Sequence, residues 1–252
     1  MLIGHTIVGS GSEGVIVNHG WFGGEAFEPM LPFLDTDTFT YAFMDCRGYG
    51  KSKDMKGEYT MNEIAADVAG LAEHLEWSKF HMVGHSMGGM ALCRVATDAG
   101  ERIKSAVALN PVPASGVPLD DDTWAFMAGA KDDDGNRRGI LDMTTGSRLC
   151  GKWLDMMVES STRNSDREAF GAYLTAWSKT DFAEASKRIK TPMLVLVGEH
   201  DPNFNVEFMN STYLAWYENA ELEELKNTGH YPMQETPVYL ATAIDNFMRK
   251  HI

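Results

Sequence analysis

The chain has 252 residues, of which 22 are Lys or Arg and 36 are Asp or Glu, so its formal net charge is −14. This length permits one large domain with an insertion, and the acidic balance argues against binding to nucleic-acid phosphates or to an anionic membrane surface. Three cysteines, odd in number and far apart in the chain, indicate neither a disulfide framework nor a zinc site.

Residues 1–17 contain no basic stretch followed by a sustained apolar segment, and no later stretch reaches the length of a membrane span. We therefore expect a soluble, cytoplasmic protein. Strand-like runs recur along the chain with helical stretches between them, which predicts an α/β fold with a doubly wound, mostly parallel sheet flanked by helices. The predicted strands are 2–8, 14–18, 40–44, 80–83, 105–109, 193–197 and 221–225.

The clearest predicted helix begins at Thr60. Thr60 and Glu63 have the spacing of a capping box. Apolar residues follow at helical spacing, namely Ile64, Val68, Leu71 and Leu75. This helix is expected to pack on the sheet just before the strand at 80–83.

The pentapeptide Gly84-His85-Ser86-Met87-Gly88 follows that strand and opens another helical stretch. A G-x-S-x-G sequence at a strand-to-helix junction makes Ser86 the candidate nucleophile, because small neighbours let strand and helix approach while the turn exposes the hydroxyl. The Met87 amide then lies at a helix N-terminus, where unpaired N–H groups and the helix dipole favour a developing oxyanion.

Between residues 110 and 191 the strand rhythm stops. Apolar residues of the stretch 113–190 recur at helical intervals, which predicts a helical insertion. The polar run 131–139 lacks the ligand spacing of a calcium loop and is predicted to be a solvated turn. Large apolar side chains of the insertion either line a pocket or form a packed face. The pocket candidates are Trp124, Met127, Met143, Trp153, Met157 and Trp177.

A serine hydroxyl needs a base, and the base needs a partner that fixes its tautomer. Asp201 follows the strand at 193–197, so its carboxylate is expected at the carboxyl edge of the sheet, where open α/β sheets bind ligands. His230 lies in a loop bounded by Gly and Pro after the strand at 221–225. Glu199 is the competing acid, and His200 is expected at the surface. A last helix is predicted over 237–251.

The chain order Ser86, Asp201, His230 and two further motifs resemble the α/β-hydrolase family. One motif is His19-Gly20-Trp21 after the strand at 14–18, and the other is the D-x-R-G-x-G-x-S loop at 45–52. The resemblance covers residues 1–112 and 191–252, with 113–190 as a helical cap or lid. It implies that the Trp21 and Met87 amides form an oxyanion hole, although the Trp21 ring equally fits a pocket wall. The short N-terminus departs from the family pattern and leaves room for a single leading strand.

The resemblance implies a serine hydrolase that acts on carboxylic esters of small hydrophobic substrates through an acyl-enzyme, without metal or organic cofactor. Lactone opening, carbon–carbon bond hydrolysis and perhydrolysis use the same triad and stay open as alternatives. A ligand-binding scaffold of this fold without catalysis is the alternative of another class. The expected partner is a small-molecule substrate and neither nucleic acid nor membrane. The oligomeric state is not predicted.

Overall fold

The computed structural model describes residues 1–252, which fold around a seven-stranded sheet in the order β1-β3-β2-β4-β5-β6-β7. The strands are β1 (His5–Gly9), β2 (Glu13–Asn18), β3 (Phe39–Met44), β4 (Phe80–His85), β5 (Ile103–Leu109), β6 (Met193–Gly198) and β7 (Ala220–Leu225). Each predicted strand is present, and the prediction of a mostly parallel α/β sheet is confirmed.

The N-terminal strand β1 is the antiparallel member of the sheet, because it runs against β3 while all other neighbours are parallel. The single leading strand expected from the short N-terminus is therefore present. After β2 the chain passes to β3 on one side and returns to β4 on the other. This reversal opens a crevice at the carboxyl ends of β2 and β4, which is the usual ligand site of such sheets.

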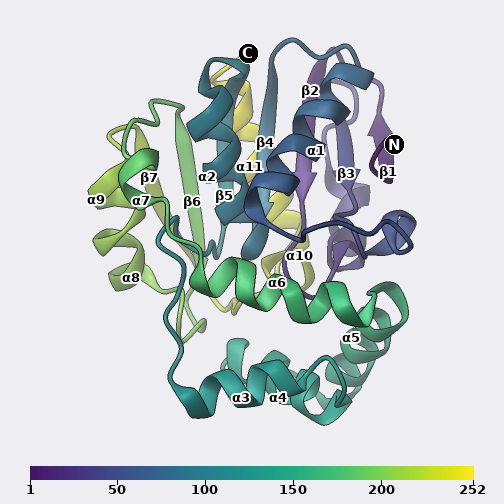
Figure 1. Cartoon of the computed structure of the whole chain (residues 1–252). Helices are drawn as coiled ribbons and strands as arrows, with labels where there is room; N and C mark the ends of the chain where they lie inside the picture. The colour runs from purple at the N-terminus through teal and green to yellow at the C-terminus, as the bar shows by residue number, and fades with distance from the viewer.

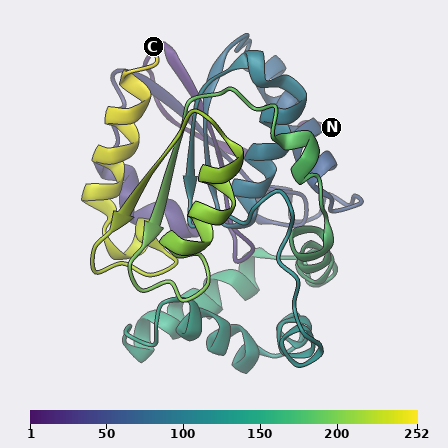
Figure 2. The ribbon, with the colours of Figure 1, turned by 90° about the vertical axis from the view of Figure 1, so that its left-hand side faces the viewer.

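Helices cover both faces of the sheet (Figure 1). They are η1 (Gly24–Phe33), η2 (Gly50–Ser52), α1 (Met61–His74), α2 (Met87–Ala99), η3 (Gly100–Arg102), α3 (Asp121–Gly129), α4 (Asp134–Thr144), α5 (Gly151–Asn164), α6 (Arg167–Lys179), α7 (Ala183–Ser186), α8 (Val206–Ser211), α9 (Tyr213–Trp216), α10 (Pro232–Glu235) and α11 (Pro237–Arg249). The helices α1 and α2 lie on one face and α11 on the other (Figure 2). None of the helices combines the length and apolar composition needed to cross a membrane.

Helix α1 has the N-cap that the sequence predicts, but the second hydrogen bond of the predicted capping box is made to a different residue. The Thr60 hydroxyl accepts a hydrogen bond from the Glu63 amide at 3.2 Å. The Glu63 carboxylate accepts from the Tyr59 amide at 2.8 Å, one residue before the cap. The reciprocal contact of a capping box is thus made to the preceding residue.

Residues 110–192 form the connection between β5 and β6 and are called the β5–β6 segment. The segment contains α3 to α7, and its longer helices lie beyond the carboxyl ends of the strands (Figures 1 and 2). The predicted solvated turn at 131–139 is wrong in its second half. Helix α4 begins at Asp134, with Asp133 accepting from the Gly135 amide. Arg137 is buried, its guanidinium lies 3.8 Å from the Phe170 ring centre, and it donates to the Ala130 carbonyl. Polar composition alone does not reveal that such a side chain turns inward.

A buried histidine in β4 predicts how stability depends on pH. Burial and the nearby Lys104 charge lower the pKa of His81 to about 4, although the Glu13 carboxylate lies 3.7 Å from its Nε2 atom and acts in the opposite direction. The unfolded chain, with a histidine pKa near 6.5, takes up the proton first as the pH falls. The stabilising contribution is therefore complete above pH 6.5 and is lost towards pH 4, by about 3 kcal/mol.

Urea unfolding at pH 7.5 and pH 4.5 measures this loss. His81→Gln is expected to reduce the fall in unfolding free energy, whereas His74→Gln on the exposed side of α1 leaves it unchanged. An unaltered fall in His81→Gln would contradict the assignment.

Candidate active site

The turn between β4 and α2 presents Ser86 with the backbone angles φ 53° and ψ −116°. This is a strained conformation for a residue with a side chain. A Cβ added to Gly84 would lie 2.3 Å from the Gly88 carbonyl oxygen, and one added to Gly88 would lie 2.4 Å from the Asn18 carbonyl oxygen. Both glycines are therefore required for the close approach of β2, β4 and α2. The turn places the Ser86 side chain in a cavity at the carboxyl edge of the sheet.

Two backbone amides lie beside Ser86. Met87 is the first residue of α2, where an N–H group has no acceptor within the helix. On the other side, a Cβ on Gly20 would lie 3.1 Å from the Ser86 Cβ, so the turn after β2 packs directly against the elbow. The next amide is that of Trp21, which makes no backbone hydrogen bond. The two amides predicted as oxyanion donors thus flank Ser86.

The peptide plane before Trp21 is held by a buried histidine. The Nε2 atom of His19 accepts from the Cys46 amide at 3.0 Å, so the proton of the neutral ring is on Nδ1. Nδ1 donates to the Gly20 carbonyl at 2.7 Å, and burial lowers the pKa of His19. Because the Gly20 carbonyl and the Trp21 N–H share one peptide plane, this contact fixes the direction of that N–H.

Asp201 and His230 meet in the loops after β6 and β7. The Asp201 Oδ2 atom lies 2.6 Å from His230 Nδ1, and the two residues are 2% and 5% exposed. Burial raises the pKa of the Asp201 carboxyl, but the His230 charge and hydrogen bonds from His230 and two backbone amides outweigh it and hold the pKa below its usual value. His230 and Ser86 line the same cavity. No hydrogen bond joins their side chains, a separation that substrate binding often closes in such enzymes.

Asn110 is a contact of the acid that the sequence analysis missed. Its side-chain amide donates to Asp201 Oδ2 at 2.9 Å. The Asn203 and Phe204 amides donate to Oδ1 at 3.0 and 3.1 Å. Asn110 directly follows β5. Its position after a strand, like that of Asp201 after β6, predicts a side chain at the carboxyl edge of the sheet, so the same reasoning would have identified it.

The competing acid takes another role. Glu199 accepts from the Asn227 amide at 2.9 Å and lies 3.3 Å from the Lys226 ammonium, which closes a surface turn. His200 is partly exposed, and its ring lies 3.9 Å from the Glu199 carboxylate. Of the two carboxylates considered for the base, Asp201 is the one that contacts His230.

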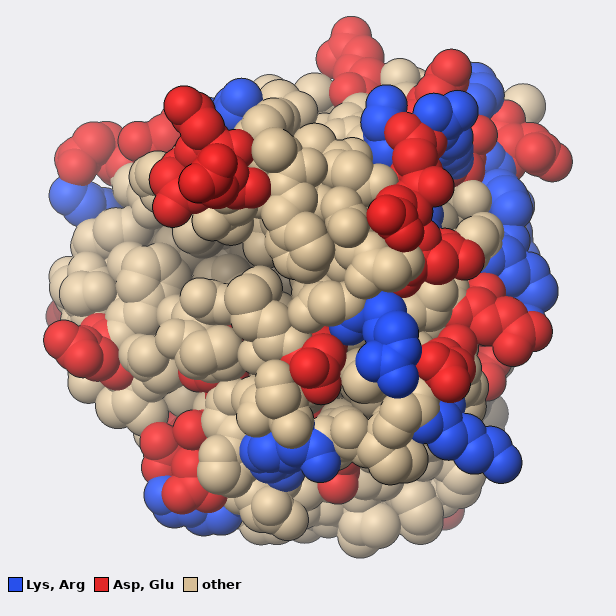
Figure 3. Space-filling model, turned by 90° about the horizontal axis from the view of Figure 1, so that it is seen from below, with Lys and Arg blue, Asp and Glu red and all other residues tan.

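The cavity over Ser86 has a volume of about 210 Å³. Its walls include the Trp21 ring, Phe22, Phe204 and Tyr231, and no Lys, Arg, Asp or Glu lines it. The β5–β6 segment contributes the apolar side chains of Val112, Val117, Leu119, Met127, Ile140, Met143 and Trp177. On the side of the molecule where this segment lies, the surface has a wide hollowed area with few charged residues (Figure 3). The cavity is smaller than the roughly 300–1,000 Å³ of pockets that hold drug-sized ligands.

Three of the six pocket candidates, Met127, Met143 and Trp177, line this cavity. The other three do not, and this part of the prediction is wrong. The Trp124 ring packs under the Lys179 ammonium at 3.6 Å, Trp153 donates to the Gln234 side chain at 3.2 Å, and Met157 is buried in the core. Helical spacing identifies the inner face of a helix but not which of its residues meets the elbow.

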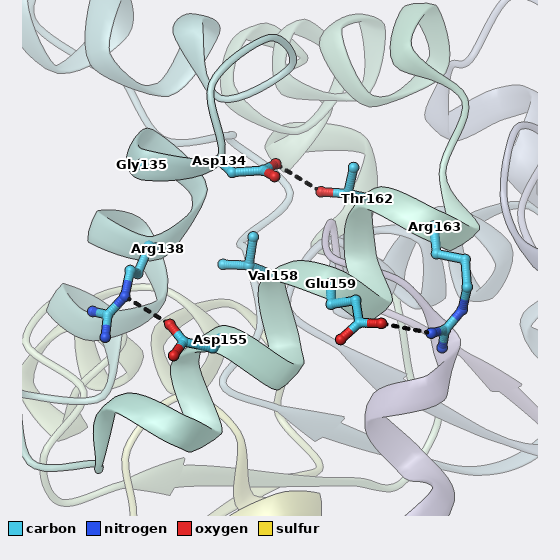
Figure 4. Close-up of a pocket in the computed structure, with 8 residues that line it drawn as sticks. All are labelled: Asp134, Gly135, Arg138, Asp155, Val158, Glu159, Thr162 and Arg163. Carbon is cyan, nitrogen blue, oxygen red and sulfur yellow. Dashed lines mark hydrogen bonds and ion pairs between the residues drawn. The ribbon is translucent and has the colours of Figure 1, made fainter.

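A more open cavity lies between α4 and α5 (Figure 4). Its polar groups pair with one another, because Arg138 lies 3.1 Å from Asp155, Thr162 donates to Asp134 at 2.8 Å and Arg163 lies 3.7 Å from Glu159. It is separate from Ser86 and offers no unpaired group for a ligand. The side chains form no group of three or more His, Cys, Asp or Glu that could hold a metal ion.

Comparisons with known proteins identify the family to which this fold belongs. A model of the alpha/beta hydrolase fold family matches residues 14–237. The chain is 26% identical over 240 residues to a non-heme haloperoxidase of Rhodococcus erythropolis, covering 88% of this chain and 86% of that one. It is 27% identical over 224 residues to a bifunctional esterase/perhydrolase of Acinetobacter calcoaceticus, covering 82% and 81%.

Among solved structures, an esterase from Exiguobacterium antarcticum has a TM-score of 0.88 at 19% identity, over 98% of this chain and 95% of that one. This likeness concerns the fold alone. The family model spans most of the chain, from β2 to the start of α11. The chain therefore belongs to the α/β-hydrolase fold family and is a hydrolase.

Proposed function

We propose that the protein hydrolyses small, uncharged carboxylic esters through an acyl-enzyme on Ser86. The observation that carries the proposal is the meeting of Ser86, His230 and Trp21 at one apolar cavity of about 210 Å³, with the Met87 amide directly after Ser86 at the start of α2. Burying an unpaired carboxylate in such a cavity is costly, because no Lys or Arg side chain there compensates its charge. The net charge of −14 also repels anionic substrates.

In the proposed reaction the Ser86 oxygen attacks the ester carbonyl and its proton passes to His230 Nε2. The Asp201 hydrogen bond keeps the other ring nitrogen protonated and stabilises the imidazolium. The Trp21 and Met87 amides stabilise the oxyanion, and loss of one such donor costs about 3 kcal/mol in comparable enzymes. His230 protonates the leaving alcohol as the carbon–oxygen bond breaks. Water then attacks the acyl group with His230 as base, which releases the acid and restores Ser86.

We further propose that helices α3 to α6 act as the cap over the site. Seven apolar side chains of the β5–β6 segment line the cavity, and four of them lie on α3, α4 and α6. The Trp21 ring stacks on Phe170 of α6 at 4.4 Å. The Trp21 indole N–H also donates to the Phe170 carbonyl at 2.7 Å. In this proposal the cap both limits substrate size and excludes water from the acyl-enzyme.

A pair of substrates that differ mainly in charge tests the proposal. Methyl 4-acetoxybenzoate is expected to be deacetylated with a kcat/KM about 100-fold or more above that of 4-acetoxybenzoate, because only the second must bury a carboxylate. Release of the phenol is measured at pH 7.5, with spontaneous hydrolysis subtracted. Equal values of kcat/KM would contradict an uncharged site, and no turnover of any ester would contradict the esterase proposal.

Perhydrolysis is the second candidate, favoured by the similarity to a bifunctional esterase/perhydrolase. The acyl-enzyme would be the same, with hydrogen peroxide replacing water as the attacking group and a peracid as product. Adding peroxide to the same ester assay and measuring halide oxidation distinguishes the two. A lactone and a coloured dienol diketone in the panel cover the remaining alternatives.

A further inference from the structure

The loop that carries His230 has its backbone held from both sides. The His230 carbonyl accepts from His85 Nε2 at 2.8 Å, and the His230 amide donates to the Thr144 carbonyl at 3.2 Å. Thr144 is the last residue of α4 in the β5–β6 segment. The neighbouring Gly229 lies so close that an added Cβ would be 2.7 Å from the Thr145 Cα. The imidazole is thus attached to backbone that cannot move without breaking several contacts.

The two amides that flank His230 are held by one carboxylate. Glu235 Oε2 accepts from the Gly229 amide at 2.8 Å, and Oε1 accepts from the Tyr231 amide at 3.2 Å. Its side chain is 3% exposed. A carboxylate with both oxygens occupied by neighbours of His230 fixes the loop more firmly than any single contact, since hydrogen bonds to a charged acceptor are the stronger kind.

The same carboxylate is paired with an arginine of the β5–β6 segment. Arg148 lies in the loop between α4 and α5, and its guanidinium donates to Glu235 Oε2 at 2.8 Å. It also donates to the Asn227 carbonyl at 2.9 Å and to the Thr145 carbonyl at 3.2 Å. One guanidinium therefore joins Glu235, the strand-to-loop junction before His230 and the end of α4.

We propose that Glu235 and Arg148 are positioning residues for His230. Through Arg148, the position of the His230 imidazole depends on how the β5–β6 segment packs against the His230 loop. The inference rests on the proposed role of His230 as the base. A base on a displaced loop no longer reaches the Ser86 hydroxyl, and misplacement by an ångström can cost about 100-fold in rate. Most of the apolar walls lie on elements that neither residue contacts, so substrate binding is expected to change much less than the rate.

The test compares kcat and KM of Glu235→Gln and Arg148→Met with those of the whole wild-type protein on a neutral ester. Active sites are counted by exhaustive labelling with a fluorophosphonate, so that misfolded protein does not enter kcat. Each variant is expected to lose about 10- to 100-fold in kcat per labelled site, with a much smaller change in KM. The double variant loses no more than the larger single loss, because both residues act through one contact.

Glu199→Gln is the matched control. Glu199 also accepts a hydrogen bond from an amide of this loop and lies near a cation, but that amide belongs to Asn227, three residues before His230. It is expected to keep the wild-type kcat. Wild-type kcat in both test variants overturns the inference, as do losses that multiply in the double variant or that appear only as fewer labelled sites. A wild-type protein that is never labelled at Ser86 overturns the proposed function itself.

Discussion

Replacement of Ser86 by alanine is expected to lower kcat on a neutral ester by about 10⁴- to 10⁶-fold. The side chain occupies a strained turn with φ 53°, and such strain is retained where the surrounding structure and a function require it. The elbow glycines allow β2, β4 and α2 to approach closely and hold Ser86 at this turn. The expected residual rate comes from binding and the two amides alone.

Initial rates and intact-protein mass after fluorophosphonate treatment measure this loss. The wild-type protein is expected to gain one phosphonyl group and Ser86→Ala none, while Ser10→Ala at the surface behaves as wild type. A Ser86→Ala protein that keeps its esterase rate would contradict the nucleophile assignment. Tight binding of an ester by the wild-type protein without turnover would favour the ligand-binding alternative.

The strands and the parallel sheet could be predicted because their signals are local. Seven apolar runs separated by helical stretches specify a parallel sheet, and every strand lies within two or three residues of its predicted bounds. The helix after Thr60 has its cap in the sequence itself. The buried Arg137 is different, because its partners are a carbonyl seven residues away and a ring on α6. Contacts of that kind depend on how helices pack and leave no periodic pattern.

The candidate site divides in the same way. Ser86, Asp201 and His230 each lie in the turn or loop that follows a strand, so the topology alone directs them to one edge of the sheet. The cavity wall is set by the β5–β6 segment, whose helices have no sheet register to place them. Half of its predicted lining residues therefore lie elsewhere. The support of His230 by Glu235 and Arg148 joins residues 87 apart in the chain, and no short motif describes such a pair.

Asp201→Asn is expected to lower kcat by about 10⁴-fold with little change in KM. Asp201 acts only as an acceptor, since His230, Asn110 and two backbone amides all donate to it. An asparagine has one acceptor oxygen and one donor group. In one orientation the asparagine NH₂ faces the two backbone amides, which are also donors. In the other it faces His230 and forces Nδ1 to accept. The ring proton then occupies Nε2, the nitrogen that must be unprotonated to act as base.

The matched variant is Glu199→Gln, which alters the other carboxylate of the same turn. The Glu199 carboxylate accepts from the Asn227 amide and has no contact with His230. The kcat of Glu199→Gln is therefore expected to equal that of the wild type. Loss of activity in Glu199→Gln with retention in Asp201→Asn would transfer the acid role to Glu199. An equal loss in both variants would contradict the assignment of the acid role to Asp201 alone.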